Sequence, residues 1–300
     1  MTSSESGDEP HGVAIVGNPY SGASDNQARI KALAGELQSR GLDVRMIWDL
    51  GELREATADP NFARQFRALV AAGGDGTLNC VINSRIPVPL AMFPLGNENL
   101  FARQFGHSPD PKAAAAMIAA GKTQAIDLGR AGDRLFSIVA SAGFDGEAAH
   151  RLAQWRQDAG RLKRVRSLSY LRPIAAAAFR YRYPILDVEV DGRRLQGALA
   201  MVFNLPQYAN DLPLAYDALG DDGLLDWVVF AKPGSMTLIH YALDVWRGRH
   251  RKRADVFYGR AKRVVLSCQQ PVPVEIDGEA AGFAPLEIEV VPAAIEVIVS

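Results

Sequence analysis

Three glycines and an aspartate make the sharpest chemical signal in the chain. A short apolar run leads into Gly73-Gly74-Asp75-Gly76-Thr77-Leu78-Asn79, and an apolar helical pattern follows. Glycines let backbone amides approach a polyphosphate, and a helix N-terminus adds partial positive charge. A phosphate would repel Asp75 directly, so its carboxylate is better suited to orient a metal, a water or a substrate hydroxyl. The structural alternative is a plain strand-to-helix turn capped by Asp75 or Thr77.

Two further loops also follow apolar runs that are predicted to be strands. They read Asn18-Pro19-Tyr20-Ser21-Gly22 and Gly96-Asn97-Glu98-Asn99-Leu100-Phe101-Ala102-Arg103. Ligands of open α/β sheets bind at the carboxyl ends of the strands, so three such loops predict one shared crevice. None of the loops matches the lysine-containing P-loop or the G-x-G-x-x-G dinucleotide pattern.

Two acidic turns occur late in the chain, within alternating apolar segments. They read Asp222-Gly223-Leu224-Leu225-Asp226 and Ile276-Asp277-Gly278-Glu279. Asp-Gly between alternating segments is typical of a β-hairpin, and for each turn this is the structural reading.

The first third of the chain alternates predicted strands and helices. Apolar runs at 13–16, 42–48, 70–72 and 88–93 predict strands, and helical spacing predicts helices near 30–37, 62–69, 78–83 and 97–104. This alternation with short glycine-rich turns indicates a parallel sheet with helices on its faces. We expect an α/β nucleotide-binding domain over residues 11–125, after a disordered N-terminus at 1–10.

The pattern changes near residue 125. Short alternating segments at 136–140, 185–190, 198–203, 225–230, 264–266, 272–276 and 286–291 predict an antiparallel β-sandwich. Helical insertions are expected at 147–182 and 235–248. We therefore expect a β-rich domain over 126–285, a C-terminal segment at 286–300 that returns to the first domain, and an active site in the crevice between the domains.

Composition narrows the class of protein. The 300 residues include 33 Lys and Arg against 34 Asp and Glu, and this net charge of −1 argues against a protein built to coat nucleic acid. Cys80 and Cys268 are too few for a disulfide framework. No apolar run reaches the ~18 residues of a membrane span, and the acidic N-terminus does not resemble a signal peptide. We expect a cytoplasmic protein.

Two basic segments stand out against this balanced charge. Residues 151–182 contain nine Lys or Arg and one acid, and residues 247–263 contain eight and one, with aromatic residues interleaved or adjacent. Such clusters suit an anionic membrane surface, although solvated helix faces would have the same composition. No nucleic-acid partner is expected, and a homodimer is left open.

Taken together, the motifs resemble the diacylglycerol kinase catalytic-domain family, which includes bacterial lipid kinases and sphingosine kinases and shares a fold with NAD kinases. The resemblance runs in a consistent order over residues 12–300. It includes Ile126-Asp127-Leu128-Gly129 and Ala142-Gly143-Phe144-Asp145. It implies a parallel α/β N-terminal nucleotide-binding domain followed by an antiparallel β-sandwich.

The resemblance also implies an activity. An ATP- and Mg²⁺-dependent lipid kinase of this kind transfers the γ-phosphate to the hydroxyl of a diacylglycerol-like or sphingoid lipid, at the inner face of the membrane. Glu279 would accept the hydroxyl proton with Asp277 close by, and Asp75 is the alternative base, as in the sphingosine kinase branch. The Asp222 carboxylate and the carbonyls of Leu219 and Leu224 would hold the family's structural Mg²⁺. The implied ATP-binding residues are Asn18, Pro19, Tyr20, Ser21, Gly22, Gly73, Gly74, Asp75, Gly76, Thr77, Leu78, Asn79, Asn97 and Asn99.

The chain departs from the family pattern at several positions. Cys80 replaces a usual glutamate, Asn97 replaces a usual threonine, and Asn210-Asp211 replaces a usual glycine pair. These departures leave the lipid acceptor open. The alternative functions are an NAD kinase-like phosphotransferase and a catalytically inactive, membrane-associated nucleotide or lipid sensor.

Overall fold

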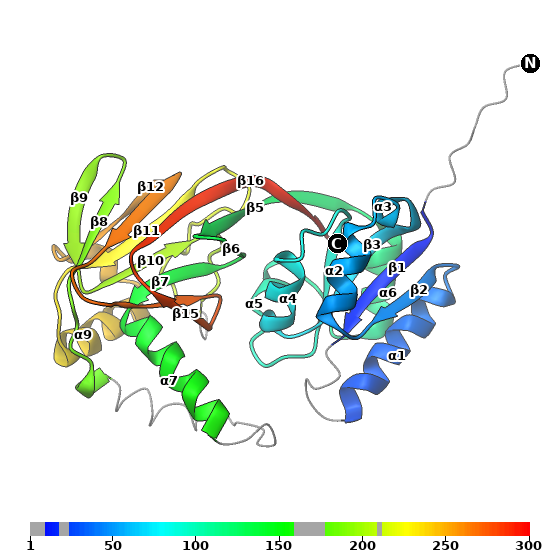
Figure 1. Cartoon of the computed structure of the whole chain (residues 1–300), viewed down its shortest axis with the longest axis horizontal. Helices are drawn as coiled ribbons and strands as arrows, with labels where there is room; N and C mark the ends of the chain where they lie inside the picture. Colours follow the sequence, from blue (N-terminus) through cyan, green and yellow to red (C-terminus); the bar gives the residue numbers. More distant parts are fainter. Residues whose placement is uncertain (1–9, 18–23, 159–177, 209–211) are drawn as a thin grey trace, which may run out of the picture. The chain divides into compact units, whose positions relative to one another are not determined.

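The computed structural model describes residues 10–17, 24–158, 178–208 and 212–300. These residues form two compact units, shown in Figure 1. The first comprises Met1–Ala125 together with Ile295–Ser300, and the second comprises Ile126–Ala294. The predicted loop at 18–22 and residues 1–9 of the predicted disordered N-terminus at 1–10 lie outside the described residues.

The first unit is built on a parallel sheet. Its strands lie in the order β2 (Asp43–Ile47), β1 (Gly12–Gly17), β3 (Phe66–Gly73) and β4 (Leu90–Pro94), and the end of β16 (Leu286–Ile298) pairs in parallel with β4. Strands β1 and β4 are buried along their whole length. Their unbroken apolar sequences therefore fit a sheet that is covered on both faces.

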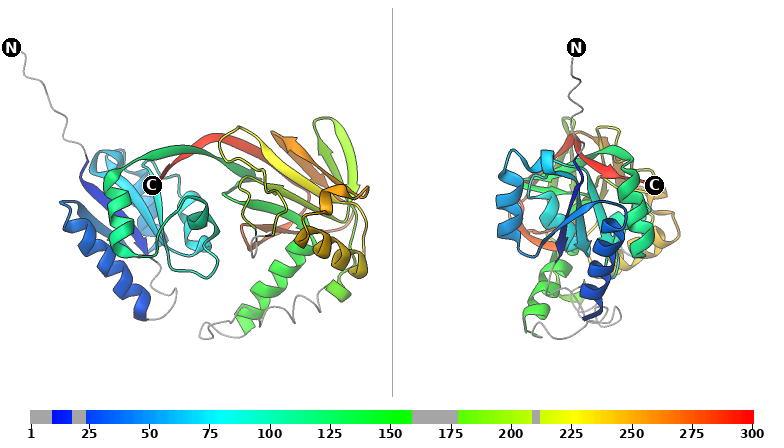
Figure 2. Two further views of the ribbon diagram at one scale, coloured as in Figure 1. Left: turned by 180° about the vertical axis from the view of Figure 1, so that it is seen from behind. Right: turned by 90° about the vertical axis from the view of Figure 1, so that its right-hand side faces the viewer.

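Helices cover this sheet, as the right-hand view of Figure 2 shows. Helices α1 (Ser24–Gln38) and α6 (Pro111–Ala120) share one core cluster with β1 and β3. The remaining helices are α2 (Leu50–Ala58), α3 (Phe62–Gln65), α4 (Asp75–Ile82) and α5 (Leu100–Gln104). Helix α4 follows β3 directly, and α5 follows the loop after β4, so both begin at the carboxyl edge of the sheet.

The helix predicted over residues 62–69 is wrong in its second half. Helix α3 ends at Gln65, and Phe66 has extended φ and ψ of −117° and 127° as β3 begins. The four-residue spacing of Phe62 and Phe66 produced the helical signal, and their rings do lie 4.6 Å apart. Pairing of β3 with β1 on one side and β4 on the other outweighs this local preference.

The second unit contains two layers of strands. One is a six-stranded sheet in the order β12 (Val256–Ala261), β11 (Leu225–Phe230), β10 (Leu199–Phe203), β7 (Val139–Gly143), β14 (Pro273–Ile276) and β15 (Glu279–Phe283). Its pairings are antiparallel. The other contains β16, β13 (Arg263–Ser267), β8 (Leu186–Val190) and β9 (Arg193–Gly197), with β5 (Thr123–Ala131) and β6 (Arg134–Phe136) beside β16.

Buried side chains from both layers form one core. They include Phe136, Leu186, Val202 and Trp227. The predicted antiparallel β-sandwich is therefore confirmed. Strands β12 and β15 were not predicted, because exposed polar or small residues interrupt the alternation on which the prediction depended.

Helices also accompany these strands in the described part of the second unit. They are α7 (Phe144–Asp158), α9 (Ser235–Trp246) and the short η3 (His250–Lys252). The predicted helical insertion at 147–182 overlaps α7, and its part at 159–177 lies outside the described residues. Within the described part of the chain, no helix combines the length and apolar character needed to cross a membrane.

Candidate functional site

Two glycine-containing loops meet at the carboxyl edge of the sheet in the first unit. Gly73 ends β3 and Gly74 caps the start of α4, while Pro94 of β4 pairs with Gly73. The Leu95 amide then donates a hydrogen bond of 2.9 Å to the Gly73 carbonyl. The parallel pairing of β3 with β4 therefore brings the loop at 73–79 beside the loop at 96–99.

Close contacts within and between these loops require glycine at two of their positions. A Cβ atom on Gly96 would lie 2.7 Å from the Gly74 Cα, and one on Gly73 would lie 2.2 Å from the Thr77 Oγ1. Both distances are far below ordinary van der Waals contact. The sequence therefore leaves bare backbone at this edge, which is also what a polyphosphate needs.

The asparagines predicted to bind nucleotide differ in their surroundings. Asn99 has a left-handed φ of 48°, accepts a hydrogen bond from the Gly96 amide and donates one to the Gly96 carbonyl, both at 2.9 Å. Asn79 is buried and accepts a hydrogen bond from Asn83 within α4. Asn97 is exposed at the crest of its loop. Asn99 therefore shapes its loop, whereas Asn79 bonds to the residue that follows α4, and nucleotide contact by the three asparagines stays a prediction.

Asp75 is the first residue of α4 and is half-buried. A carboxylate in the first turn of a helix is stabilised by the partial positive charge of the amides there. This position suits a carboxylate that orients a metal or a water.

The second unit contains the hairpin turn between β14 and β15. Asp277 and Gly278 have left-handed φ values of 47° and 81°. The Asp277 carboxylate accepts four hydrogen bonds of 2.8–3.2 Å from the amides of Ser137, Ile138 and Val139 and the Ser137 hydroxyl. Burial raises the pKa of Asp277, and the backbone amides oppose this rise. Asp277 therefore anchors the turn to the start of β7.

Glu279 lies at the other end of this turn and has a different environment. Its side chain is 45% exposed and forms an ion pair with Arg134 of β6. The turn thus separates two acidic residues, of which Asp277 is bonded inward and Glu279 faces solvent.

A buried polar cluster lies behind the same hairpin, and sequence analysis did not identify it. Ser141 of β7 lies opposite Glu275 of β14, and its hydroxyl oxygen lies at hydrogen-bond distance from both Asp145 and Glu275, 2.9 Å from a carboxyl oxygen of each. Tyr208 donates to Asp145 at 2.8 Å, and the Gly278 amide donates to Glu275. Burial raises the pKa of both carboxyls, and the charge of Asp145 raises the pKa of Glu275 further.

Asp127 organises the predicted metal turn, although the sequence indicated it only as part of a strand. Its carboxylate accepts hydrogen bonds from the amides of Gly223 at 2.7 Å and Ala293 at 2.8 Å. Its own amide donates to the Gly220 carbonyl at 2.7 Å, and Asn204 donates to its carbonyl at 2.9 Å. Asp127 is buried, so these contacts fix the turn at 220–223 to β5.

The predicted metal ligands lie in this turn, and their chemistry suits a hard cation. One Asp222 carboxylate oxygen accepts the Leu224 amide at 3.0 Å, and the other lies 3.2 Å from Arg260. Leu219 is exposed, so its carbonyl lies in an accessible stretch of chain. A carboxylate and two carbonyls match the oxygen ligands of Mg²⁺, and water would complete the shell. Arg260 would compete with the cation for Asp222.

Asp226 shares this acidic neighbourhood. Burial raises the pKa of Asp226 to about 6, the charges of Asp217 and Asp222 add to the rise, and Arg260 opposes it. The Arg260 guanidinium therefore neutralises a local concentration of carboxylates in the described structure.

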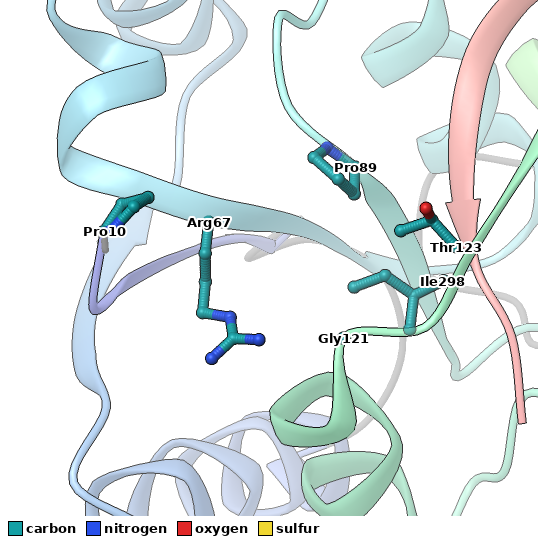
Figure 3. Close-up of a pocket in the computed structure, with 6 residues that line it drawn as sticks. All are labelled: Pro10, Arg67, Pro89, Gly121, Thr123 and Ile298. Carbon is teal, nitrogen blue, oxygen red and sulfur yellow. The ribbon is translucent and has the colours of Figure 1, made fainter. Parts of the chain in front are cut away.

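A hollow of about 250 Å³ lies elsewhere in the first unit. It is lined by Pro10, Arg67, Pro89, Gly121, Thr123 and Ile298, and Figure 3 shows the Arg67 side chain extending into it. Pro10 precedes β1 and Pro89 precedes β4, so the hollow lies at the amino edge of the sheet. This is the edge opposite the two glycine loops.

Comparisons with known proteins match this arrangement. Residues 12–131 match the family model for the diacylglycerol kinase catalytic domain. Residues 138–299 match the model for the YegS C-terminal NAD kinase beta sandwich-like domain.

The chain also resembles individual proteins along nearly its whole length. It is 32% identical to a diacylglycerol kinase of Mycobacterium tuberculosis, covering 95% of this chain and 94% of that protein. It is 29% identical to a diacylglycerol kinase of Bacillus subtilis, covering 91% of each. A solved structure from Bacillus anthracis aligns over 100% of this chain and 98% of that chain with a TM-score of 0.74 at 19% identity, which supports the fold.

The loop contact predicts the effect of adding one methyl group. Gly96→Ala forces its Cβ against Gly74 and the Asn99 side chain, so we expect a loss of about 1–3 kcal/mol in the free energy of unfolding. Gly35→Ala is the matched control, because Gly35 lies inside α1 with open space around it. It should gain about 0.5–1 kcal/mol. Urea denaturation compares the two, and equal stability of Gly96→Ala and wild type would refute the contact.

The buried carboxyl cluster predicts a pH-dependent stability. Its folded pKa values are raised, so the stability it contributes is complete below about pH 4 and is lost as pH rises through those values. Glu275→Gln keeps an acceptor for Gly278 and removes one titrating group. We expect it to match or exceed wild-type stability at pH 8, by up to about 1–3 kcal/mol, and to respond less to pH.

Thermal denaturation between pH 5 and pH 8 measures this difference. The control is Glu55→Gln, an exposed residue of α2. If the curves of Glu275→Gln and wild type stay parallel across this range, the carboxyl pair does not govern the pH response.

Proposed function

Because this chain belongs to the diacylglycerol kinase catalytic-domain family, we propose that it transfers the γ-phosphate of ATP to the hydroxyl of a diacylglycerol-like or sphingoid lipid. The family membership supports a phosphotransferase that acts on a lipid alcohol. In the proposed reaction the acceptor oxygen bonds to the γ-phosphorus, the bond to the β-phosphate oxygen breaks, and ADP leaves. The hydroxyl proton passes to a carboxylate.

The different surroundings of Asp277 and Glu279 indicate which of the two carboxylates accepts this proton in the proposed reaction. Both Asp277 oxygens already accept hydrogen bonds from the residues at the start of β7, whereas Glu279 is exposed at the end of the same rigid turn. A general base must present a free lone pair to the hydroxyl proton. We therefore assign the base role to Glu279 and a positioning role to Asp277, with Asp75 as the alternative base.

The loops of the first unit supply the proposed ATP contacts. Gly73, Gly74 and Gly96 leave the backbone bare at the carboxyl edge of the sheet. Amides of such loops can donate to phosphate oxygens, and the start of α4 adds partial positive charge. The loop at 18–22, which lies outside the described residues, is proposed to contribute as well.

Mg²⁺ is proposed to bind the Asp222 carboxylate and the carbonyls of Leu219 and Leu224. When bound, the ion would hold the turn at 219–224 in one conformation, which is the role of the structural Mg²⁺ that the family resemblance implies. The Asp127 carboxylate holds the backbone of the turn through the Gly223 amide, so Asp127 would keep this donor set in place.

The two alternative functions make different predictions. An NAD kinase-like enzyme would phosphorylate NAD, and the second family model does carry an NAD kinase-like description. The similar proteins of Mycobacterium tuberculosis and Bacillus subtilis are named diacylglycerol kinases, which favours a lipid as the phosphate acceptor. An inactive sensor would bind ATP without transferring phosphate to any alcohol.

Phosphate transfer from ATP and Mg²⁺ to a short-chain diacylglycerol, sphingosine and NAD tests the proposal. We expect a phosphorylated lipid product, and Glu279→Gln should lower kcat about 10²–10⁴-fold because it removes the proton acceptor. Its stability should change by less than about 1 kcal/mol, because it breaks only an exposed ion pair.

Asp277→Asn is the matched comparison. It places an amide group against backbone donors, so it should cost about 1–3 kcal/mol of stability. If Glu279→Gln retained full kcat while Asp75→Asn lost it, the base would be Asp75. If NAD alone were phosphorylated, the NAD kinase-like function would replace the lipid kinase proposal. If the protein bound ATP but phosphorylated none of these alcohols, the result would favour the inactive sensor.

A further inference from the structure

Helix α9 has two faces of opposite character in the second unit. Tyr241 and Val245 are buried on its inner face. Tyr241 contacts the Phe230 ring of β11 at 4.8 Å, and its hydroxyl accepts a hydrogen bond from the Lys232 amide at 3.1 Å. Figure 2 shows α9 at the periphery of this unit. The helix is therefore held firmly by one side only.

The outer face of α9 carries large apolar side chains. Met236, Ile239, Leu243 and Trp246 are 60%, 38%, 41% and 69% exposed. Their spacing of three, four and three residues places them in one stripe along the helix, opposite Tyr241 and Val245. Single exposed apolar residues are ordinary, but a continuous stripe marks a surface that something else covers.

Unpaired basic residues follow this stripe directly. Arg247, Arg249 and Lys252 are exposed, and within the described ranges they form no ion pair. Their neighbours Arg251 and Arg253 behave differently, because they pair with acidic residues, including Asp217 and Asp244. The acid of α9 is thus already neutralised, and the end of the helix carries net positive charge.

The chain segment beside the start of α9 has the same chemistry. The Ser235 hydroxyl donates to the Ala178 carbonyl at 2.7 Å, which fixes residue 178 beside the first turn. Phe179 is 65% exposed, and Arg180 and Arg182 are exposed as well. Apolar and basic side chains therefore occur at both ends of α9.

We propose that the outer face of α9, with Arg247, Arg249 and Lys252, docks the protein on an anionic lipid bilayer. Exposed aliphatic side chains can enter the acyl boundary, Trp246 suits the interface, and the basic residues match anionic headgroups. This docking surface rests on the proposed function, because it supplies the membrane contact that a lipid-modifying enzyme requires.

The positive charge beside α9 favours an anionic bilayer over the other partners that could cover this surface. Because basic residues occur at both ends of α9, a two-fold contact between copies of this chain would bring basic residues together in either helix orientation, which is unfavourable. The chain's own residues 159–177 contain five Lys or Arg and no acid, so their charge also opposes covering this surface. An anionic bilayer offers both the apolar interior and the opposite charge.

Co-sedimentation with vesicles tests the docking surface. Wild type should bind phosphatidylcholine vesicles containing phosphatidylglycerol at least tenfold more tightly than pure phosphatidylcholine vesicles, and added salt should weaken this binding. Leu243→Ser/Trp246→Ser should lose at least tenfold in affinity. Arg247→Gln/Arg249→Gln should lose most of the preference for the anionic lipid.

The matched controls are exposed residues of the same types elsewhere. Leu50→Ser and Arg193→Gln/Arg194→Gln should bind vesicles as wild type does, because these residues lie on α2 and β9. Brominated lipids add a positional readout, since they should quench wild-type tryptophan fluorescence more than that of Trp246→Phe.

Equal binding to neutral and anionic vesicles, or unchanged binding by the α9 variants, would overturn the docking surface. A concentration-dependent dimer that the α9 variants abolish would assign the stripe to a second copy instead. Phosphate transfer to a monomeric, water-soluble short-chain diacylglycerol separates the two proposals. The α9 variants should retain this activity, and vesicle binding without any transfer would leave docking intact and refute the proposed function.

Discussion

The hydrogen bonds between the Asp277 carboxylate and the start of β7 are the interaction on which the acidic hairpin depends. They hold a turn with two left-handed residues against three consecutive backbone amides. A buried carboxylate loses hydration, and these donors compensate for that loss. The bonds fix the direction of β15, and with it the position of Glu279. The Asp277 carboxylate is therefore occupied by hydrogen bonds, while Glu279 stays exposed at the end of a turn that these bonds fix.

The glycine loops show a related constraint with backbone in place of side chains. Gly74 and Gly96 approach so closely that neither tolerates a Cβ atom without movement, and the Asn99 side chain replaces bonds that the loop backbone cannot make alone. Adjacent parallel strands bring these loops together. The bare edge therefore depends on the pairing of β3 with β4 as much as on the glycines themselves.

Sequence analysis succeeded where local pattern and tertiary structure agree. Strands β1 and β4 were visible as apolar runs, seven strands of the second unit were visible as short alternating segments, and the ordered motifs identified the family. These seven strands are β7, β8, β10, β11, β13, β14 and β16. The failures have identifiable causes. Phe62 and Phe66 have helical spacing, yet Phe66 begins strand β3 because it pairs with β1. Asp127 and Asp145 were noted only as parts of motifs, and their roles were not predicted. The partners that define those roles lie 63–166 residues apart in the sequence, and the spacing within one segment does not indicate such contacts.

The basic residues of the second unit show why composition alone misjudges a surface. Arg251, Arg253 and Arg260 contribute to the positive charge of residues 247–263, yet each pairs with aspartate in the described structure. Among the described residues of this segment, Arg247, Arg249, Lys252 and Lys262 form no ion pair, and the first three follow the apolar stripe of α9. An arginine that is already paired with an aspartate adds little binding energy at an anionic headgroup, whereas an unpaired basic side chain is attracted to it without such competition. The fold therefore turns a long basic segment into a short basic patch, and places it where exposed apolar side chains can add their own affinity.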